Sequence, residues 1–203
     1  MTLERETETP ASLDIEHTSL AAEIHQDNIA AGWWTNITTG ESIIETRSRP
    51  EMLMLIVTEL SEAHEAWSNG AMDDKLPELY GFDVELADAA IRLYDLLGCD
   101  AAGMNFDRVV RSNWQQWQWT THSTSRQVME LVNCISAAME GYRKGNRAKY
   151  LEALWRCLGG IYAVADVFCD DGLPEVIAAK RAYNAQRADH RIENRLKADG
   201  KKF

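Results

Sequence analysis

The sequence predicts an all-α protein built as an antiparallel helical bundle. Apolar side chains recur with a period near 3.6 residues over long stretches, which is typical of amphipathic helices. Only four prolines occur among 203 residues, so few positions interrupt these helices. The loop motifs GxGxxG and GxxxxGK[ST], which follow a strand in many nucleotide-binding α/β folds, are absent from the sequence. Helices alone are therefore expected to form the core.

The beginning of the chain lacks the helical periodicity of the rest. Residues 1–18 are mostly polar, so we expect a mobile N-terminal segment there. A first helix is expected from about residue 19 to residue 31, where Gly32 stops it. The sequence thus predicts a single helical domain over 19–188, followed by a basic C-terminal tail over 189–203.

A first helical hairpin is expected over about 50–98. Pro50 suits the first turn of one helix, and Gly70 suits its end. The next helix is expected from about residue 83 to residue 97, with Gly98 as its C-terminal stop. Because the connection between the two helices is short, they are expected to run antiparallel.

A second helical hairpin is expected over about 125–170. Thr124 and Gln127 have the spacing of a capping box, which would begin its first helix. Asn146 is expected to cap a long second helix that reaches about residue 169. Pro174 then suits the first turn of the last helix.

The two hairpins share a weak internal similarity. Alignment on their glycines places residues 59–70 on 134–145, and Asn113 falls on Asn184. This similarity predicts a duplication, with the two hairpins packed as a pseudo-symmetric tandem. The alternative is a helical insertion within a single copy, which would give no pseudo-symmetry.

The distribution of charge restricts the class of ligand. The net charge of −11 argues against a chain whose main partner is a nucleic acid polymer. Basic residues gather near the C-terminus, where eight Lys or Arg stand against three acids between residues 180 and 203. This distribution favours a small anionic ligand held through metal ions.

The N-terminal sequence and the cysteines predict a compartment. The N-terminus is acidic without an apolar signal region, and no apolar run is long enough to span a bilayer. We therefore expect a cytoplasmic protein with no membrane partner. The four cysteines form no CxxC pair, so we expect reduced thiols.

Two pairs of acids point to a metal site. Glu59 and Glu62 lie three positions apart on one expected helix, and therefore on one face of it. Glu85 and Asp88 have the same spacing on the next helix. Converging carboxylates require a cation, and oxygen ligands without His or Cys favour Mg²⁺ or Mn²⁺, which also bind phosphate oxygens. The competing interpretation places all four acids on solvated helix surfaces.

Four segments carry a resemblance to a known family. They are AEIHQDNIAAGWW (22–34), LMLIVTELSEAHEAW (53–67), ELADAAIRLYDLLG (85–98) and AAKRAYNAQRADHR (178–191). Together they resemble the MazG-like all-α nucleoside triphosphate pyrophosphohydrolases, whose pattern is EExxE, a spacer and then ExxD. The resemblance implies hydrolysis of a nucleoside triphosphate, with deoxynucleotides favoured, to a monophosphate and pyrophosphate. The implied cofactor is Mg²⁺, two or three ions per site, and the implied role is sanitation or rebalancing of a nucleotide pool.

The sequence departs from the family pattern in two respects. Thr58 stands where the family has the first acid of its doublet. Residues from about 100 to 173 have no counterpart in the compact single-copy members, and the predicted duplication explains this segment. In the second copy, the four acids are replaced in order by Cys134, Ala137, Arg156 and Gly159. Conversely, Lys180 has no basic counterpart in the first copy, where Val109 occupies that position. These complementary losses predict one composite site, with metal on the first hairpin and phosphate-binding groups from the second half.

The resemblance also implies a role for each site residue. Glu59 and Glu62 are the expected catalytic residues, one of which takes a proton from the attacking water. The expected metal ligands are Glu59, Glu62, Glu85 and Asp88. The expected substrate-binding residues are Trp33, Trp34, Asn36 and Trp67 around the base, and Lys180, Tyr183, Asn184, Arg187, His190 and Arg191 around the phosphates.

A second class of function remains open. A non-catalytic helical binding or regulatory module could retain the same fold, although the four acids kept in the first half favour an enzyme. Family members assemble into oligomers, which implies a homodimer here, whereas a duplication would let one chain supply both halves of the site. The base, the sugar, the phosphorus attacked and the number of metal ions are not determined by the sequence.

Overall fold

Helices make up the architecture of the chain, as predicted. The computed structural model describes residues 15–117, 123–197 and 199–201, and within these ranges the only β-pairing is isolated bridges. No helix among these residues has both the length and the apolar character needed to cross a membrane. The helices are α1 (His17–Ala30), α2 (Arg49–Asn69), α3 (Gly81–Asp100), α4 (Asp107–Gln116), α5 (Thr124–Arg143), α6 (Arg147–Phe168), α7 (Leu173–Gln186), a 3₁₀ turn (Ala188–His190) and α8 (Ile192–Arg195).

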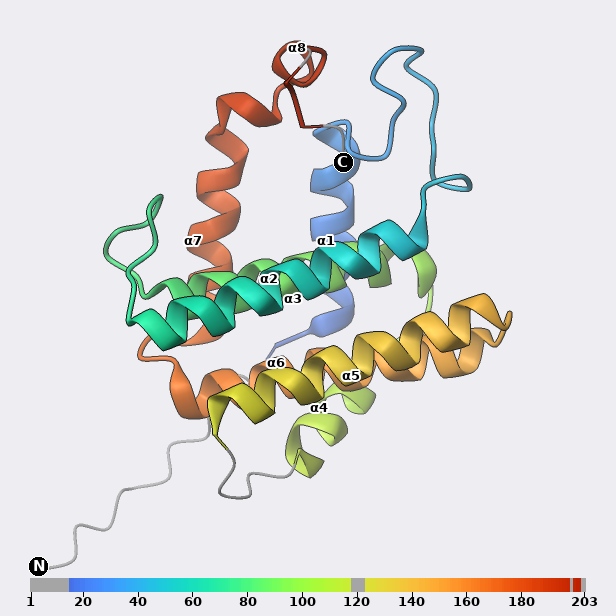
Figure 1. The fold of residues 1–203 in the computed structure, drawn as a ribbon. Helices are drawn as coiled ribbons and strands as arrows, with labels where there is room; N and C mark the ends of the chain where they lie inside the picture. The colour runs from blue at the N-terminus through green and yellow to red at the C-terminus, as the bar shows by residue number, and fades with distance from the viewer. Residues whose placement is uncertain (1–14, 118–122, 198, 202–203) are drawn as a thin grey trace, which may run out of the picture.

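Two antiparallel hairpins, α2–α3 and α5–α6, form the two layers of the bundle (Figure 1). Local signals mark both ends of α2 and the start of α6 where the sequence predicts. Pro50 lies in the first turn of α2, and Gly70 ends that helix in the left-handed conformation, with φ of 60°. The side chain of Asn146 caps α6 by accepting a hydrogen bond from the Lys149 backbone N–H at 3.0 Å.

Two predicted helix boundaries are wrong, both because of contacts from other elements. Gly98 does not end α3, which continues to Asp100. A Cβ at residue 98 would lie 2.5 Å from the Cβ of His25, so this glycine instead allows α1 to pack closely on α3. The predicted capping box at Thr124 does not form, because Gln127 accepts a hydrogen bond from the Trp117 indole at 2.8 Å.

The first helix begins earlier than expected. Residues 1–14 of the predicted mobile segment lie outside the described residues. Residues 17 and 18, in contrast, belong to α1, and the side chain of His17 is buried. Its Nδ1 lies 2.6 Å from the Tyr94 hydroxyl, which fixes the start of α1 against α3.

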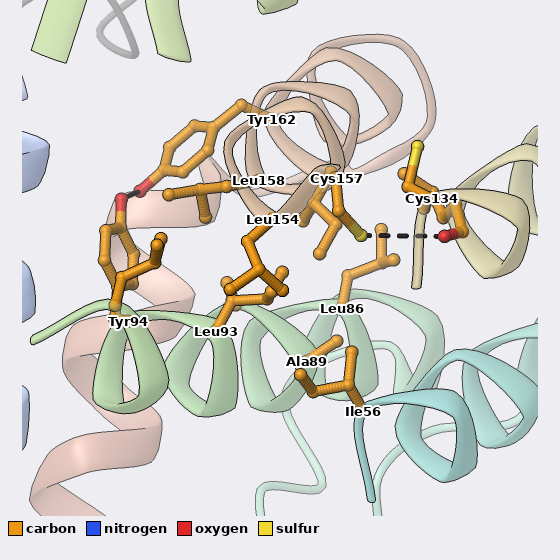
Figure 2. Packing of buried hydrophobic residues seen from close by; sticks show 14 of the residues in the cluster. Ile56, Leu86, Ala89, Leu93, Tyr94, Cys134, Leu154, Cys157, Leu158 and Tyr162 are labelled. Atoms are coloured by element: carbon orange, nitrogen blue, oxygen red, sulfur yellow. Dashed lines mark hydrogen bonds between the residues drawn. The ribbon is translucent and has the colours of Figure 1, made fainter. Parts of the chain in front are cut away.

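The core lies between the two hairpins, where α3 packs on α6 (Figure 2). Leu86 and Leu93 of α3 face Leu154 and Leu158 of α6, and all four side chains are fully buried. The Tyr94 hydroxyl donates a hydrogen bond to the Tyr162 hydroxyl at 2.8 Å, which satisfies a polar group within this apolar contact. The apolar face of α3 is therefore covered, and its remaining faces are left for α1, α2 and α7.

The helix that follows each hairpin packs on the opposite hairpin. α4 follows α3 in the chain but packs on α6, whereas α7 follows α6 and packs on α3. Figure 1 shows α7 and α1 running across the α2–α3 layer, while α4 lies on the far side beside α6. This exchange brings residues of α7, from the second half, onto the acidic helix α3 of the first half. The arrangement agrees with a pseudo-symmetric tandem, although the duplication itself stays a prediction.

Candidate functional site

Three of the four predicted metal-binding acids lie together. Glu59 projects from α2, and Glu85 and Asp88 project from successive turns of α3. One carboxylate oxygen from each residue lies within 4.8 Å of the others. Glu59 is 6% exposed, and the other two are partly buried. We call these three residues the acidic cluster.

The acidic cluster carries more negative charge than its surroundings neutralise. Burial, together with the charges of Asp88 and Glu59, raises the pKa of Glu85 to about 8. Burial also raises the pKa of Asp88, although the neighbouring Lys180 ammonium opposes this change. Carboxyl groups that resist ionisation in this way are stabilised by an added positive charge. Three oxygen ligands in such an environment fit a hard divalent cation, which is the donor chemistry that Mg²⁺ and Mn²⁺ prefer.

Two basic side chains already contact the acidic cluster. Arg92 of α3 pairs with Glu59, with 2.5 Å between Nη2 and Oε1. Lys180 of α7 pairs with Asp88, with 2.8 Å between Nζ and Oδ2, and its side chain is only 5% exposed. The exchange of α7 between hairpins therefore brings a basic residue of the second half to the acids of the first half, as the predicted composite site requires.

The fourth predicted acid, Glu62, lies outside the acidic cluster. Its side chain is exposed on α2, one turn beyond Glu59. Desolvation and the charge of Glu59 raise its pKa, so it faces the same negative field. Thr58, which replaces the family's first acid, donates its hydroxyl to the Met54 carbonyl of its own helix at 3.1 Å. Thr58 therefore adds no ligand to the cluster.

A cavity of about 300 Å³ begins at the acidic cluster and extends along α3. Asp88 lines the cavity as well as belonging to the cluster, and Ile91, Arg92 and Asp95 continue the same wall. Met52 and Leu55 of α2 contribute apolar surface to it. The volume is at the lower end of that of small-molecule sites.

Basic side chains dominate the charge around this cavity. Arg47, Arg92, Arg187 and Lys201 line it, against the two acids of α3. A polyanion can therefore enter with its charge facing cations, while its metal-binding end faces the acidic cluster. Arg92 follows Asp88 by one helical turn, so the sequence contained a signal for this residue on the metal-binding face. Arg47 lies in a loop, and no sequence pattern connected it with the site.

Four of the predicted substrate-binding residues line the cavity. They are Trp33, Asn184, Arg187 and His190. The Asn184 Oδ1 is buried and has no hydrogen-bond partner among the described residues, so it is available to a ligand. Trp33 is partly exposed, with the Arg195 guanidinium 3.7 Å from its ring centroid. His190 meets the same indole edge-on, which fixes the C-terminal segment against the cavity.

The other six predicted substrate-binding residues do not line the cavity, and one of them, Lys180, instead contacts the acidic cluster. Trp34 is 1% exposed and faces the core, so it cannot stack on a base. The Asn36 side chain accepts hydrogen bonds from the backbone of Thr38 and Thr39, which makes it a turn residue. Trp67 packs on aromatic rings at the far end of α2. Tyr183 lies beneath the Arg187 guanidinium, and Arg191 is exposed.

The corresponding position of the second half cannot form an equivalent site. Gly159 of α6 occupies the place of Asp88, and a Cβ there would lie 2.7 Å from the Val110 carbonyl and 2.8 Å from the Asn113 Cβ. α4 thus rests directly on the α6 backbone, where α7 instead presents Lys180 to Asp88. Among the residues that the structure describes, the acidic cluster is the only group of three or more side chains that could hold a metal ion.

The chain matches no family model, no curated protein and no solved structure. The likeness to MazG-like pyrophosphohydrolases therefore stays a prediction made from the sequence.

Proposed function

We propose that this protein hydrolyses a nucleoside triphosphate to a monophosphate and pyrophosphate with the help of Mg²⁺. The observation that carries the proposal is an acidic cluster that shares Asp88 with the lining of a cavity in which basic side chains outnumber acids. This combination suits a ligand that is a polyanion and also brings, or recruits, a divalent cation. The family resemblance supplies the reaction type and the role in nucleotide-pool sanitation or rebalancing.

Different residues would bind the metal ion and the phosphates. Glu59, Glu85 and Asp88 would hold the cation, which when bound supplies neutralisation of the phosphates and activation of water. Lys180 of α7 and Arg187, which directly follows that helix, would neutralise charge on the pyrophosphate portion. The unpartnered Asn184 Oδ1 lies in the same wall and accepts a hydrogen bond from the ligand.

Glu62 is the best candidate for the general base. Its pKa is raised by desolvation and by the charge of Glu59, and a carboxylate with a raised pKa accepts a proton more readily near neutral pH. Unlike Glu59, it makes no ion pair in the structure described. The side chain is exposed on the same helix as Glu59 and can therefore receive a proton from water beside the cluster.

One observation favours the alternative, a non-catalytic helical module. Arg92 and Lys180 already neutralise Glu59 and Asp88, so part of the acid network is satisfied without a metal ion. In that case the cluster would stabilise the contact between α7 and α3. An enzyme should hydrolyse a nucleotide and bind a divalent cation, whereas a non-catalytic module should not hydrolyse any nucleotide.

The test measures pyrophosphate release from each of the common ribo- and deoxynucleoside triphosphates in the presence of Mg²⁺. We expect release with at least one nucleotide, and its loss by at least about 100-fold in Glu85→Gln and Asp88→Asn, since both remove a charged ligand. Glu65→Gln is the matched control, because Glu65 is an exposed acid on α2 outside the cluster. No release from any nucleotide, or unchanged release in both cluster variants, would refute the enzyme.

A further inference from the structure

The end of the cavity away from the acidic cluster contains a buried carboxylate, Asp95. It lies seven residues beyond Asp88 on α3, which places the two side chains about 10 Å apart along the helix axis. Asp95 is 5% exposed and lines the cavity. A distance of this size leaves room for a sugar between a group bound at Asp95 and phosphates bound beside Asp88.

Two neighbouring side chains hold Asp95 through one of its oxygens. The Trp34 indole donates to Oδ1 at 2.8 Å, and the His25 ring nitrogen Nδ1 lies 2.8 Å from the same atom. Among the described residues, no hydrogen-bond donor reaches the other oxygen, Oδ2. Oδ2 is not fully enclosed by protein atoms, and Asp95 lines the cavity. This oxygen is therefore accessible from the cavity. Asp95 therefore presents one fixed, free acceptor to a ligand.

A donor on the same cavity wall also contacts Trp34. The Arg47 guanidinium stacks on the Trp34 ring, 4.7 Å from its centroid, and lines the same cavity. No acceptor within the described part of the chain takes a hydrogen bond from it. Burial lowers the pKa of Arg47, and the negative charge of Asp95 opposes that change. Trp34, which cannot stack on a base itself, thus positions both groups.

We propose that Asp95 and Arg47 select a nucleobase that bears an exocyclic amino group beside a ring acceptor. The Asp95 Oδ2 accepts a hydrogen bond from the amino group, and the Arg47 guanidinium donates to the neighbouring nitrogen or carbonyl. Cytosine, adenine and guanine share this donor–acceptor pattern. When bound in the same pose as cytosine, uracil and thymine place a carbonyl oxygen where cytosine has its amino group, so two acceptors would face each other. This inference rests on the proposed function, because it assigns the base end of the same cavity.

The discrimination should be measurable as a ratio of kcat/KM values. A site that hydrogen-bonds a ligand through a charged group typically rejects the analogue that lacks the partner by about 10- to 100-fold or more. The experiment compares dCTP, dATP, dGTP, dUTP and dTTP with the unmodified protein and Mg²⁺. We expect at least one amino-bearing nucleotide to exceed both dUTP and dTTP by at least about 10-fold.

The variant Asp95→Asn replaces the acceptor Oδ2 by an NH₂ group, which is a hydrogen-bond donor. Trp34 and His25 both donate, so they retain the amide oxygen and turn the new NH₂ group toward the cavity. An NH₂ group prefers a carbonyl oxygen, and the ratio of dCTP to dUTP activity should fall by at least about 10-fold. Asp100→Asn is the matched control, since Asp100 is a paired carboxylate of the same helix that does not line this cavity. Its nucleotide preference should equal that of the unmodified protein.

Binding measurements separate this inference from the proposed function. Calorimetry with dCMP and dUMP compares two nearly isosteric ligands without hydrolysis. If no triphosphate is hydrolysed but dCMP binds at least about 10-fold more tightly than dUMP, the catalytic proposal fails and the assignment of Asp95 stands. Equal binding of the two, no binding of either, or a preference for dUTP or dTTP in hydrolysis would overturn it. Should Asp95→Asn fail to fold, Arg47→Gln tests the same pair, and an unchanged preference in that variant counts against the inference.

Discussion

Replacing Glu85 by Gln should remove a pH-dependent loss of stability in the metal-free protein. The pKa of Glu85 is about 8 in the folded protein, against 4.5 for an ordinary glutamate. Between these pH values the folded state keeps a proton that the unfolded state has released. Stability conferred by this group is therefore complete below pH 4.5 and falls as the pH rises toward 8.

The size of the effect follows from the same two pKa values. A change from 4.5 to about 8 corresponds to about 5 kcal/mol of unfolding free energy. Glu85 is partly exposed, so solvent screening reduces the expected contribution to about 2–3 kcal/mol. Gln has no proton to lose, so Glu85→Gln should lack this contribution at every pH.

The assay is urea unfolding in the presence of a chelator at pH 5 and pH 9. Between these pH values the unmodified protein should lose about 2–3 kcal/mol more than Glu85→Gln. Glu65→Gln, on an exposed surface of α2, should behave as the unmodified protein. Added Mg²⁺ should restore stability at pH 9 in the unmodified protein and far less in Glu85→Gln. Equal losses in the two proteins would show that Glu85 ionises normally and would refute the electrostatic argument.

Three further predictions concern stability. Gly98→Ala should lower the unfolding free energy by about 1–3 kcal/mol, measured in urea, because its Cβ meets α1; an unchanged midpoint would contradict that close contact. Burial lowers the pKa of His17 to about 4, so stability should fall by up to about 3 kcal/mol as the pH drops from 6.5 toward 4. Urea unfolding of His17→Gln, which cannot take up that proton, should not show this acid loss. Lys180→Met should cost about 3 kcal/mol by leaving Asp88 buried without its cation, and thermal unfolding should show partial recovery in the double variant with Asp88→Asn.

The sequence predicted those features of the fold that depend on neighbouring residues. Proline in the first turn, glycine in the left-handed conformation and an asparagine cap act within a few residues, so the ends of α2 and α6 could be located. Gly98 was assigned wrongly because glycine in a helix has two uses, and only the position of α1 distinguishes them. The Gln127 side chain likewise does not cap its helix, because it accepts a hydrogen bond from Trp117, which lies before the start of that helix.

In the candidate site, too, local spacing could be predicted from the sequence, whereas contacts between distant segments could not. Glu85 and Asp88 share a helix face by spacing alone, and the antiparallel hairpin placed Glu59 opposite them. The roles of Trp34, Arg47 and Asp95 could not be predicted, because a loop, α1 and α3 meet there only in the folded protein. The family resemblance predicted Trp34 as a surface on which a base stacks, but its ring is buried and faces inward.

The exchange of α7 onto α3 has a consequence for the order in which the molecule is completed during synthesis. The α2–α3 hairpin leaves the ribosome with its carboxylates already adjacent, while the lysine that balances Asp88 is added 92 residues later. Until then Arg92 is the only basic side chain in the described structure that pairs with an acid of the nascent cluster, and Asp88 lacks its cation. The ion pairs of the acidic cluster and the cavity wall that α7 supplies are therefore completed only when the second half of the chain has been made.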